Sequence, residues 1–284
     1  MEKSMAGRIC MVTGANSGIG KATAAGLAEM GATVILVCRN REKGEAALSE
    51  IKEKSGNNSL DLMLADMSSM QSVRQLASEF RRKYDRLHVL VNNAGLFMLR
   101  RTTTGDGLET TFEVDYLSHF LLTELLIDLL KAGAPSRLVE VSSIAHYNGH
   151  IDFDDLQGEK GYGGWKAYSQ AKLAQVLFTY ELARRLKGTG VTANCLHPGT
   201  VATNIWSRPL GRAGFIAKLT RIFMMGPEGG AETPIYLASS ADVEGVSGKY
   251  FTKKKEKKSS NESDDEQVAR RLWRVSEELT GLPQ

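Results

Sequence analysis

Tyr168 and Lys172 lie four residues apart in a run that is compatible with a helix. Residues at that spacing share one face of a helix, with Cβ atoms about 5–6 Å apart. A free tyrosine has a pKa of about 10 and is a poor base at neutral pH. Two unit charges about 4 Å apart near a protein surface interact by about 4 kcal/mol, and a shift of one pKa unit corresponds to about 1.4 kcal/mol. Lys172 could therefore bring the pKa of Tyr168 into the range that suits proton transfer. An ordinary surface pair on a helix is the alternative explanation.

A group of small residues joins the first expected strand to the first expected helix. Small residues let the backbone approach a phosphate, and a helix amino terminus offers free N–H groups and a positive partial charge. The alternative is a glycine-rich turn needed only for close packing. The spacing is Gly-x-x-x-Gly-x-Gly rather than the commoner Gly-x-Gly-x-x-Gly. The residues expected to bind a dinucleotide here are Gly14, Asn16, Ser17, Gly18, Ile19 and Gly20.

The end of the second expected strand indicates which dinucleotide fits. An acidic residue there binds the ribose 2′-hydroxyl, whereas an arginine accommodates a 2′-phosphate. The stretch after Val37 has no acid and has two guanidinium groups, on Arg39 and Arg41. Arg39, with Asn40 beside it, is the better placed for bidentate phosphate contact, so NADP is predicted over NAD. The alternative is that both arginines only border a solvated loop.

The next two strand ends offer further cofactor contacts. Asp66, followed by Met67, could accept a hydrogen bond from an adenine amino group, or it could cap a helix beside Ser68 and Ser69. After the fourth expected strand, a backbone of small residues can pass close to a ribose, and an amide can brace neighbouring strands. The residues expected to do so are Asn93, Ala94 and Gly95.

The elements that must position these residues alternate along the chain. The expected strands cover 8–13, 33–38, 61–65, 87–91, 138–141 and 191–196. The expected helices cover 18–30, 42–54, 70–84, 112–131 and 165–186. Near-continuous Val/Ile/Leu strands between amphipathic helices predict an α/β fold, a single doubly wound parallel sheet of the Rossmann type with helices on both faces. Residues 1–284 are expected to form one domain, with ligands beyond the carboxyl ends of the strands.

Composition narrows the class of partner. Apolar residues make up 42% of the chain and charged residues 24%, and the net charge of +3 is too small to argue for nucleic acid. The three cysteines each lie in an apolar run, as expected of reduced, buried residues. No histidines show metal-ligand spacing, and no signal or membrane segment is expected, so a cytoplasmic location is predicted.

These motifs together resemble the short-chain dehydrogenase/reductase family over essentially the whole chain. The matching motifs, in the family's order, are Thr-Gly-x-x-x-Gly-x-Gly at 13–20, Asn-Asn-Ala-Gly at 92–95, Tyr-x-x-x-Lys at 168–172 and Pro-Gly at 198–199. Within the family the chain looks most like the retinol dehydrogenase-like branch. That closer likeness rests on His119-Phe120-Leu121-Leu122-Thr123, Val141-Ser142-Ser143-x-Ala145-His146, Asp154-Asp155-Leu156 and Leu272-Trp273-x-Val275-Ser276.

The resemblance implies a catalytic trio and no metal. Ser143 would hydrogen-bond the substrate oxygen, Tyr168 would exchange a proton with that oxygen, and Lys172 would hold the nicotinamide ribose and lower the pKa of the tyrosine. Hydride would pass between the nicotinamide and the carbonyl carbon. Ser142 would point away from Ser143, because side chains alternate along a strand. The residues implied near the carboxamide are Pro198, Gly199, Val201 and Thr203.

One position departs from the family's pattern. The family usually has an asparagine in the helix after Asn-Asn-Ala-Gly, where it anchors a water linked to the lysine, and this chain has Asp115 there. A carboxylate accepts from water but cannot donate, and its charge beside Lys172 would oppose part of the pKa depression at Tyr168. A working relay with a pH optimum shifted upward is the resulting hypothesis.

Substrate specificity is expected in the segment that follows Thr203. Residues 204–230 are predicted to form a lid over a bulky apolar substrate, since Phe215, Leu219 and Phe223 share a helical face. The alternatives that stay open are peripheral membrane contact through 212–225, a homodimer contact and plain core packing. Five positive and five negative charges cancel across 253–266, which predicts a charged surface loop. A closing amphipathic helix is expected over 264–280.

Taken together, the residues and the resemblance predict an NADP(H)-dependent oxidoreductase that interconverts a hydrophobic, retinoid- or lipid-like alcohol and its aldehyde or ketone. The alternative is a nucleotide-binding regulatory or scaffold protein with weakened catalysis, for which only Asp115 argues. A sugar-nucleotide epimerase is disfavoured because the chain is short for an added substrate domain.

Overall fold

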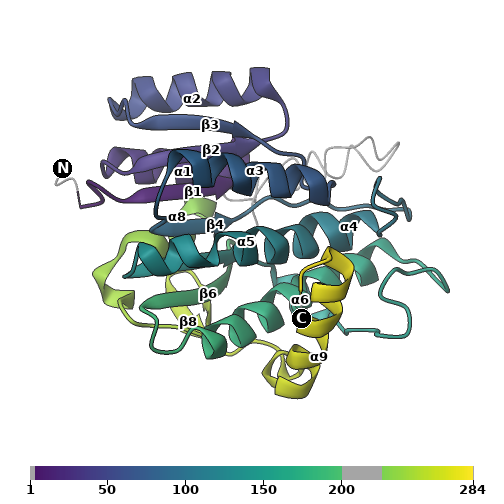
Figure 1. Cartoon of the computed structure of the whole chain (residues 1–284). Helices are drawn as coiled ribbons and strands as arrows, with labels where there is room; N and C mark the ends of the chain where they lie inside the picture. Colours follow the sequence, from purple (N-terminus) through teal and green to yellow (C-terminus); the bar gives the residue numbers. More distant parts are fainter. Residues whose placement is uncertain (1–3, 200–225, 284) are drawn as a thin grey trace.

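One eight-stranded sheet organises the chain, as a computed structural model that describes residues 4–199 and 226–283 shows (Figure 1). Its strand order is β3-β2-β1-β4-β5-β6-β7-β8. The strands are β1 (Ile9–Thr13), β2 (Thr33–Cys38), β3 (Leu60–Leu64), β4 (Val89–Asn92), β5 (Ser136–Val141), β6 (Val191–His197), β7 (Lys249–Thr252) and β8 (Lys255–Lys257). Strands β1 to β7 pair in parallel, and β8 runs antiparallel to β7. The expected doubly wound α/β sheet is confirmed, with one antiparallel edge added.

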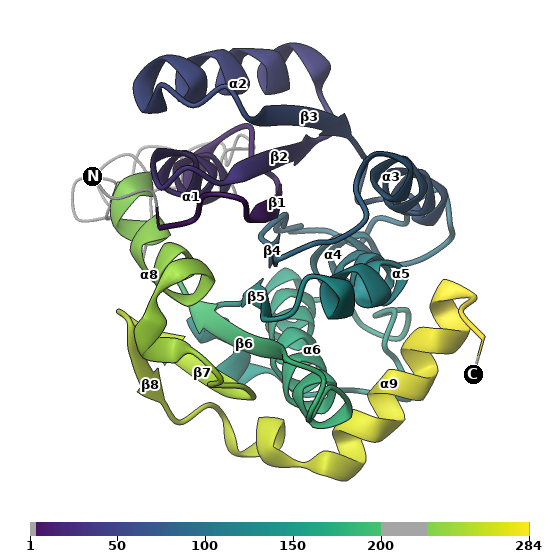
Figure 2. The same ribbon diagram turned by 60° about the vertical axis from the view of Figure 1, so that its left-hand side comes forward.

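Helices cover both faces of the sheet. They are α1 (Gly18–Glu29), α2 (Arg41–Ser55), α3 (Met70–Lys83), α4 (Thr110–Phe112), α5 (Ser118–Ala132), α6 (Gly164–Arg185), α8 (Pro227–Ser239) and α9 (Glu266–Thr280). Figure 2 shows α1, α2 and α8 on one side, and α3, α5 and α6 on the other. Each side has its own apolar core, because the strands between them are buried on both faces.

The closing helix α9 packs on the outer side of α6 (Figure 2). Trp273 anchors it, with ring centroids 5.0 Å from Phe120 and 5.7 Å from Phe178. The Arg185 guanidinium lies 4.0 Å above the Trp273 ring. An apolar stripe on one face of the helix therefore covers α6, as the sequence predicts.

Two expected elements differ in detail. The helix expected over 112–131 is interrupted by a π-helical turn, η1 (Glu113–Leu117), between α4 and α5. The charged segment 253–266 is not a continuous loop, because it contains β8 and a short 3₁₀ turn, Asn261–Asp264. Lys253 and Lys254 adopt φ values of 51° and 60°, as a tight two-residue hairpin between β7 and β8 requires.

The three cysteines, Cys10, Cys38 and Cys195, are unpaired and buried, as expected. Burial raises the pKa of the Cys10 thiol to about 12, so this residue behaves as a small hydrophobe. In the part of the chain that the structure describes, no helix has both the length and the apolar character needed to cross a membrane.

The strand order reverses direction between β1 and β4, since β1 continues through β2 to one edge and β4 starts the other half. Beyond the carboxyl ends of these two strands lies the crevice where doubly wound sheets bind ligands. The glycine-rich turn follows β1, and Asn93, Ala94 and Gly95 follow β4. The predicted cofactor motifs therefore meet at the point where the fold can use them.

Candidate active site

The turn between β1 and α1 packs so closely against the end of β4 that it favours glycine. Gly14 has a φ of +67°, a conformation that favours glycine. A Cβ at Gly20 would lie 2.4 Å from Asn93 Nδ2 and 2.5 Å from the Gly14 carbonyl oxygen. Ser17 is the N-cap of α1, yet its side chain makes no capping hydrogen bond, and the first turn has no acidic residue. The amino end of α1 thus offers unneutralised N–H groups to an anion.

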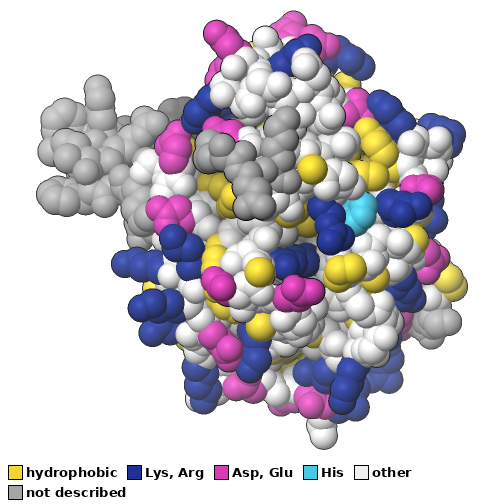
Figure 3. Space-filling model, turned by 90° about the vertical axis from the view of Figure 1, so that its left-hand side faces the viewer, with side chains coloured by type: hydrophobic (Ala, Val, Ile, Leu, Met, Phe, Trp, Pro, Cys, Tyr) yellow, Lys and Arg dark blue, Asp and Glu magenta, His cyan; other side chains and the backbone are white. Residues whose placement is uncertain are grey.

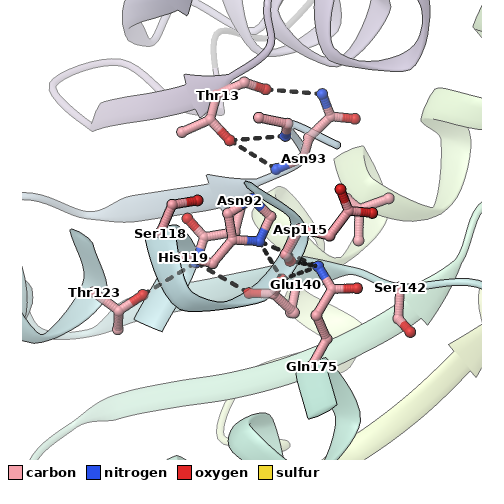
Figure 4. Close-up of polar contacts among 12 residues, drawn as sticks. Thr13, Asn92, Asn93, Asp115, Ser118, His119, Thr123, Glu140, Ser142 and Gln175 are labelled. Carbon is pink, nitrogen blue, oxygen red and sulfur yellow. Dashed lines mark hydrogen bonds and ion pairs between the residues drawn. The ribbon is translucent and has the colours of Figure 1, made fainter. Parts of the chain in front are cut away.

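Thr13 and Asn93 hold this turn against the end of β4 (Figure 4). The Thr13 hydroxyl accepts hydrogen bonds from the backbone N–H groups of Asn93, at 2.9 Å, and Ala94, at 3.0 Å. Asn93 Nδ2 donates in return to the Thr13 carbonyl oxygen at 2.8 Å. The amide therefore braces neighbouring strands, which is one of the two roles expected of this motif.

The residues predicted to choose the dinucleotide lie at the ends of β2 and β3. Arg39 is exposed and has no hydrogen-bond or ion-pair partner within the described residues. Asn40 caps α2, since its Oδ1 accepts from the Lys43 N–H at 2.9 Å.

The carboxylate at the end of β3 has a local partner. Asp66 Oδ1 accepts from the backbone N–H of Ser68 at 3.0 Å and from its hydroxyl at 2.7 Å. The N-cap of α3 is Ser69, so Asp66 is not the capping residue there. Met67 is buried beside it. One carboxylate oxygen of Asp66 is thus engaged in a local turn.

Ser143, Tyr168 and Lys172 come together beyond the end of β5. Ser143 is the N-cap of the 3₁₀ turn η2 (Ile144–Asn148), while Tyr168 and Lys172 share one face of α6. The two α6 side chains are 7% and 4% exposed, and Lys172 Nζ lies 5.3 Å from the centroid of the Tyr168 ring. The Ser143 side chain is among the groups that lower the pKa of the Tyr168 phenol. Ser142 instead donates to the Lys172 carbonyl oxygen at 2.8 Å, away from this cluster.

Asp115 lies against the same lysine. Its Oδ2 is 3.1 Å from Lys172 Nζ, and its Oδ1 accepts from the Leu96 N–H at 2.8 Å. A Cβ at Gly95 would lie 3.2 Å from Asp115 Oδ2, so the glycine leaves the carboxylate its place. The side chain is fully buried at the centre of the π-helical turn η1.

The charges in this cluster act against one another. Burial raises the pKa of Tyr168, the Lys172 cation opposes that rise, and Asp115 adds to it. Burial alone lowers the pKa of Lys172, but Asp115 and the Tyr168 phenol outweigh burial, so the pKa of Lys172 is raised. Burial raises the pKa of the Asp115 carboxyl, and Lys172 only partly reverses this. The lysine therefore stays a cation beside the phenol.

The sequence profile that defines the short chain dehydrogenases matches residues 8–209. The chain belongs to the short-chain dehydrogenase family. It is 46% identical to human retinol dehydrogenase 14, over 98% of this chain and 88% of that protein. It is 45% identical to human retinol dehydrogenase 13, over 97% of this chain and 85% of the relative.

Solved structures agree with this membership. A crystal structure of an uncharacterized protein from Mycobacterium paratuberculosis superposes with a TM-score of 0.80 at 34% identity, over 98% of this chain and 96% of the other. A short-chain dehydrogenase from Escherichia coli CFT073, crystallised with NADPH, has a TM-score of 0.72 at 27% identity, over 90% of this chain and all of the other.

Several residues of this short-chain dehydrogenase that were predicted to contact the cofactor or substrate lie beside, or within, the segment that the structure does not describe. Pro198 and Gly199 follow β6, and Gly199 has a φ of +92°. Val201 and Thr203 fall outside the described residues, as does the expected lid up to 225. The last residues of that lid, Pro227–Gly230, form the first turn of α8.

His146 is a site residue that sequence reasoning named but gave no role. The Ser260 N–H donates to His146 Nε2 at 3.2 Å, so the proton of the neutral ring sits on Nδ1. Nδ1 lies 2.7 Å from the Ser143 carbonyl oxygen and donates to it. Burial lowers the pKa of His146, which favours this neutral form. The histidine thus holds the backbone of Ser143 through its carbonyl oxygen.

Other buried polar residues beneath the site had no role in the sequence analysis. Asn92 and His119 were named only as parts of motifs, and Ser118, Glu140 and Gln175 were missed. A signal was available for Glu140, because a charged residue inside a buried parallel strand needs several partners.

A groove of about 1530 Å³ lies elsewhere on this short-chain dehydrogenase. Its lining includes the first residues of successive strands, Val89, Ser136, Val191 and Lys249. It therefore opens at the amino-end edge of the sheet, opposite the candidate site. Figure 3 shows one face of the molecule, on which basic and acidic side chains are interspersed.

Proposed function

We propose that this chain is an NADP(H)-dependent oxidoreductase that interconverts a hydrophobic alcohol and its aldehyde or ketone. The observation that carries the proposal is the cluster that half-buried Ser143 forms with buried Tyr168 and Lys172 beyond the end of β5. Its membership of the short-chain dehydrogenase family supports the same reaction class.

The cluster suits proton transfer to and from a substrate oxygen. Ser143 would donate a hydrogen bond to that oxygen, and Tyr168 would give it a proton during reduction or take one during oxidation. Lys172 favours the phenolate that reduction leaves behind, since the cation lowers the pKa that burial raises. A bound nicotinamide cofactor supplies or accepts the hydride. The protein contributes orientation and proton traffic.

The residues at the strand ends fit a dinucleotide with a 2′-phosphate. Gly14 and Gly20 leave no space for a Cβ but allow a phosphate close approach to the backbone, and the amino end of α1 is open to an anion. Arg39 is exposed and unpaired within the described residues, and no acid lies between β2 and α2. NADP is therefore proposed over NAD, in line with the NADPH complex of the Escherichia coli relative.

Apolar side chains around the tyrosine support a lipophilic substrate. Leu99 is 59% exposed, Ile144 57% and Trp165 48%. The Phe97 ring meets Tyr168 edge-on at 5.6 Å, and the Trp165 ring lies 6.1 Å from it. Exposed apolar groups beside a buried polar cluster suit a substrate with an apolar body and one reactive oxygen. Retinoid-like or other lipid aldehydes are proposed, as the names of the retinol dehydrogenase relatives suggest.

A nucleotide-binding regulatory or scaffold protein is the second candidate function. The observation in its favour is Asp115, whose charge raises the pKa of Tyr168 and so weakens the relay. Membrane contact through 212–225 stays a prediction, because that segment lies outside the described residues. The location in the cytoplasm and a homodimer also stay predictions.

The test is an NADPH-oxidation assay over aliphatic, aromatic and polyene aldehydes. Tyr168→Phe should lower kcat by about 10²-fold or more, because it removes the proton donor. Tyr84→Phe is the matched control, since the Tyr84 hydroxyl contacts Asp61 at 3.1 Å and lies away from the site. NADPH binding without turnover of any carbonyl would favour the regulatory protein.

A further inference from the structure

Glu140 is a fully buried carboxylate on β5, three residues before Ser143. Its Oε1 lies 2.6 Å from His119 Nδ1 and 2.6 Å from Gln175 Nε2. Its Oε2 accepts from Asn92 Nδ2 at 3.0 Å. Figure 4 shows the three side chains converging on this one carboxylate. A buried charge is tolerated only when its hydrogen bonds are satisfied, and here three donors satisfy it.

Each partner of Glu140 comes from an element that carries part of the candidate site. Asn92 ends β4 immediately before Asn93, His119 lies on α5 one turn after Asp115, and Gln175 lies on α6 one turn after Lys172. The carboxylate therefore ties three neighbouring elements to β5, the strand that leads to Ser143.

The link to Asp115 runs through Gln175. Gln175 Nε2 has two N–H bonds, and it donates one to Glu140 and the other to the Asp115 carbonyl oxygen at 2.7 Å. That carbonyl belongs to the π-helical turn η1, which is a local departure from α-helical geometry. Ser118 serves the preceding carbonyl, since its hydroxyl donates to the Val114 oxygen at 2.8 Å. Side chains thus hold the turn that presents the Asp115 carboxylate to Lys172.

We propose that Glu140 is a positioning residue that, through Gln175 and His119, holds the Asp115 turn and the Lys172 face of α6 in register beneath Tyr168. The proposal rests on the proposed oxidoreductase function for its catalytic consequence. It adds a residue that contacts neither Tyr168 nor any residue predicted to bind the cofactor.

The chemistry of the three partners explains why a carboxylate stands here. Asn92, His119 and Gln175 all present N–H groups, and a carboxylate offers only acceptors. A glutamine at this position would place its own NH₂ against at least one of these donors. The negative charge is also felt at the site, because Glu140 is among the groups that raise the pKa of Lys172, after Asp115 and Tyr168.

Glu140→Gln is therefore the test variant, because it keeps the shape and changes only the donor pattern and the charge. We expect kcat to fall about tenfold or more through loss of alignment, with the KM for NADPH within about twofold. The pH–rate profile should move to lower pH by about half a unit, since Glu140→Gln removes a buried negative charge that acts on Lys172, the cation beside the phenol. Glu181→Gln is the matched control. Glu181 lies on α6 and is buried like Glu140, but it pairs with Arg184 and Arg185 at 2.9 Å.

Gln175→Met is a second variant that leaves Glu140 intact and removes the donor to the Asp115 carbonyl oxygen. It should reproduce the fall in kcat, and the double variant should lose less than the two single losses combined. Wild-type kcat and pH profile in both variants would overturn the proposal. A loss in Glu140→Gln that Glu181→Gln matches, with an unmoved pH profile, would reduce Glu140 to a stability role.

A readout without turnover separates this proposal from the proposed function. The ultraviolet phenolate titration of Tyr168, obtained as the difference between each protein and its Tyr168→Phe partner, reports the phenol directly. A shift in Glu140→Gln supports the positioning role even if no carbonyl is reduced, whereas an unmoved titration counts against it. Absence of turnover in the wild type would contradict only the proposed oxidoreductase function.

Discussion

Lys172 Nζ lies 3.1 Å from Asp115 Oδ2, and both side chains are buried. The lysine therefore faces a phenol on one side and a carboxylate on the other. An ammonium that is shared between two anionic partners stabilises each of them less than it would stabilise one alone. The balance between these contacts decides how readily Tyr168 gives up its proton.

Asp115→Asn should move the pH–rate profile to lower pH. Asp115 raises the pKa of Tyr168 and Lys172 lowers it, so removing the carboxylate charge leaves the lysine to act alone. In the reductive direction activity falls as pH rises through the tyrosine pKa, and in the oxidative direction it rises there. Both curves should shift the same way, by about one unit. Asp128→Asn, an exposed change on α5, serves as the control, and coincident curves for the three proteins would contradict the retuned relay.

Arg39→Ala should weaken NADPH binding and spare NADH. A charge-assisted hydrogen bond to a phosphate contributes about 1.5–3 kcal/mol, so the Kd for NADPH should rise about tenfold to a hundredfold. Fluorescence titration with both dinucleotides measures this directly. Arg41→Ala is the comparison, because Arg41 Nη1 already pairs with Glu45 at 3.5 Å. Equal losses for NADPH and NADH would remove Arg39 from phosphate recognition.

Gly20→Ala should destabilise the protein and abolish tight dinucleotide binding. The new methyl group would lie 2.4 Å from Asn93 Nδ2 and 2.5 Å from the Gly14 carbonyl oxygen, and the second contact is with backbone. Overpacking of this kind costs about 1–3 kcal/mol. Thermal unfolding and NADPH titration should both respond, whereas Gly105→Ala, whose Cβ would meet nothing within 4 Å, should leave both unchanged. An unaltered Tm in Gly20→Ala would show that the turn can widen.

Residues that act through short spacing could be predicted from the sequence. The pair Tyr168 and Lys172 needs only one helix, and the glycine turn needs only one strand–helix junction, so local patterns suffice. The sheet followed from alternating strand and helix patterns for the same reason. Strand β7 and helix α8 were not anticipated, and their neighbouring charges and glycines weaken both periodicities.

Features that depend on contacts between distant segments could not be predicted. Glu140 is explained only by donors from three other elements, and nothing in its own strand names them. The π-helical turn at Asp115 has the sequence of a continuous helix. Its carbonyl groups accept hydrogen bonds from the side chains of Ser118 and Gln175, and Gln175 lies far away in the sequence. In the hairpin after β7, a run of cancelling charges suggested a loop, yet Lys249 and Glu256 pair across it at 2.9 Å.

Glu113 opens the same π-helical turn, and it should make the stability of the protein depend on pH. The side chain is fully buried and accepts a hydrogen bond from the Thr104 hydroxyl. Burial raises its pKa from 4.5 to about 7, and Asp106 and Asp66 add to the rise. Between these two values the folded state binds more protons than the unfolded state, so the free energy of unfolding falls as pH rises from about 4.5 to about 7.

Glu113→Gln removes this dependence, because the amide stays neutral at every pH. Relative to wild type, the variant should therefore become more stable with rising pH, by about 2–3 kcal/mol at most between pH 4 and pH 8. Urea unfolding of both proteins across this range gives the difference, from which the opposing contribution of His197, whose pKa burial lowers to about 4, cancels. Glu53→Gln, a change at an exposed position on α2, should give a flat difference. A flat difference for Glu113→Gln as well would mean that Glu113 ionises in the folded state, and the turn carrying Asp115 would then hold a second buried negative charge.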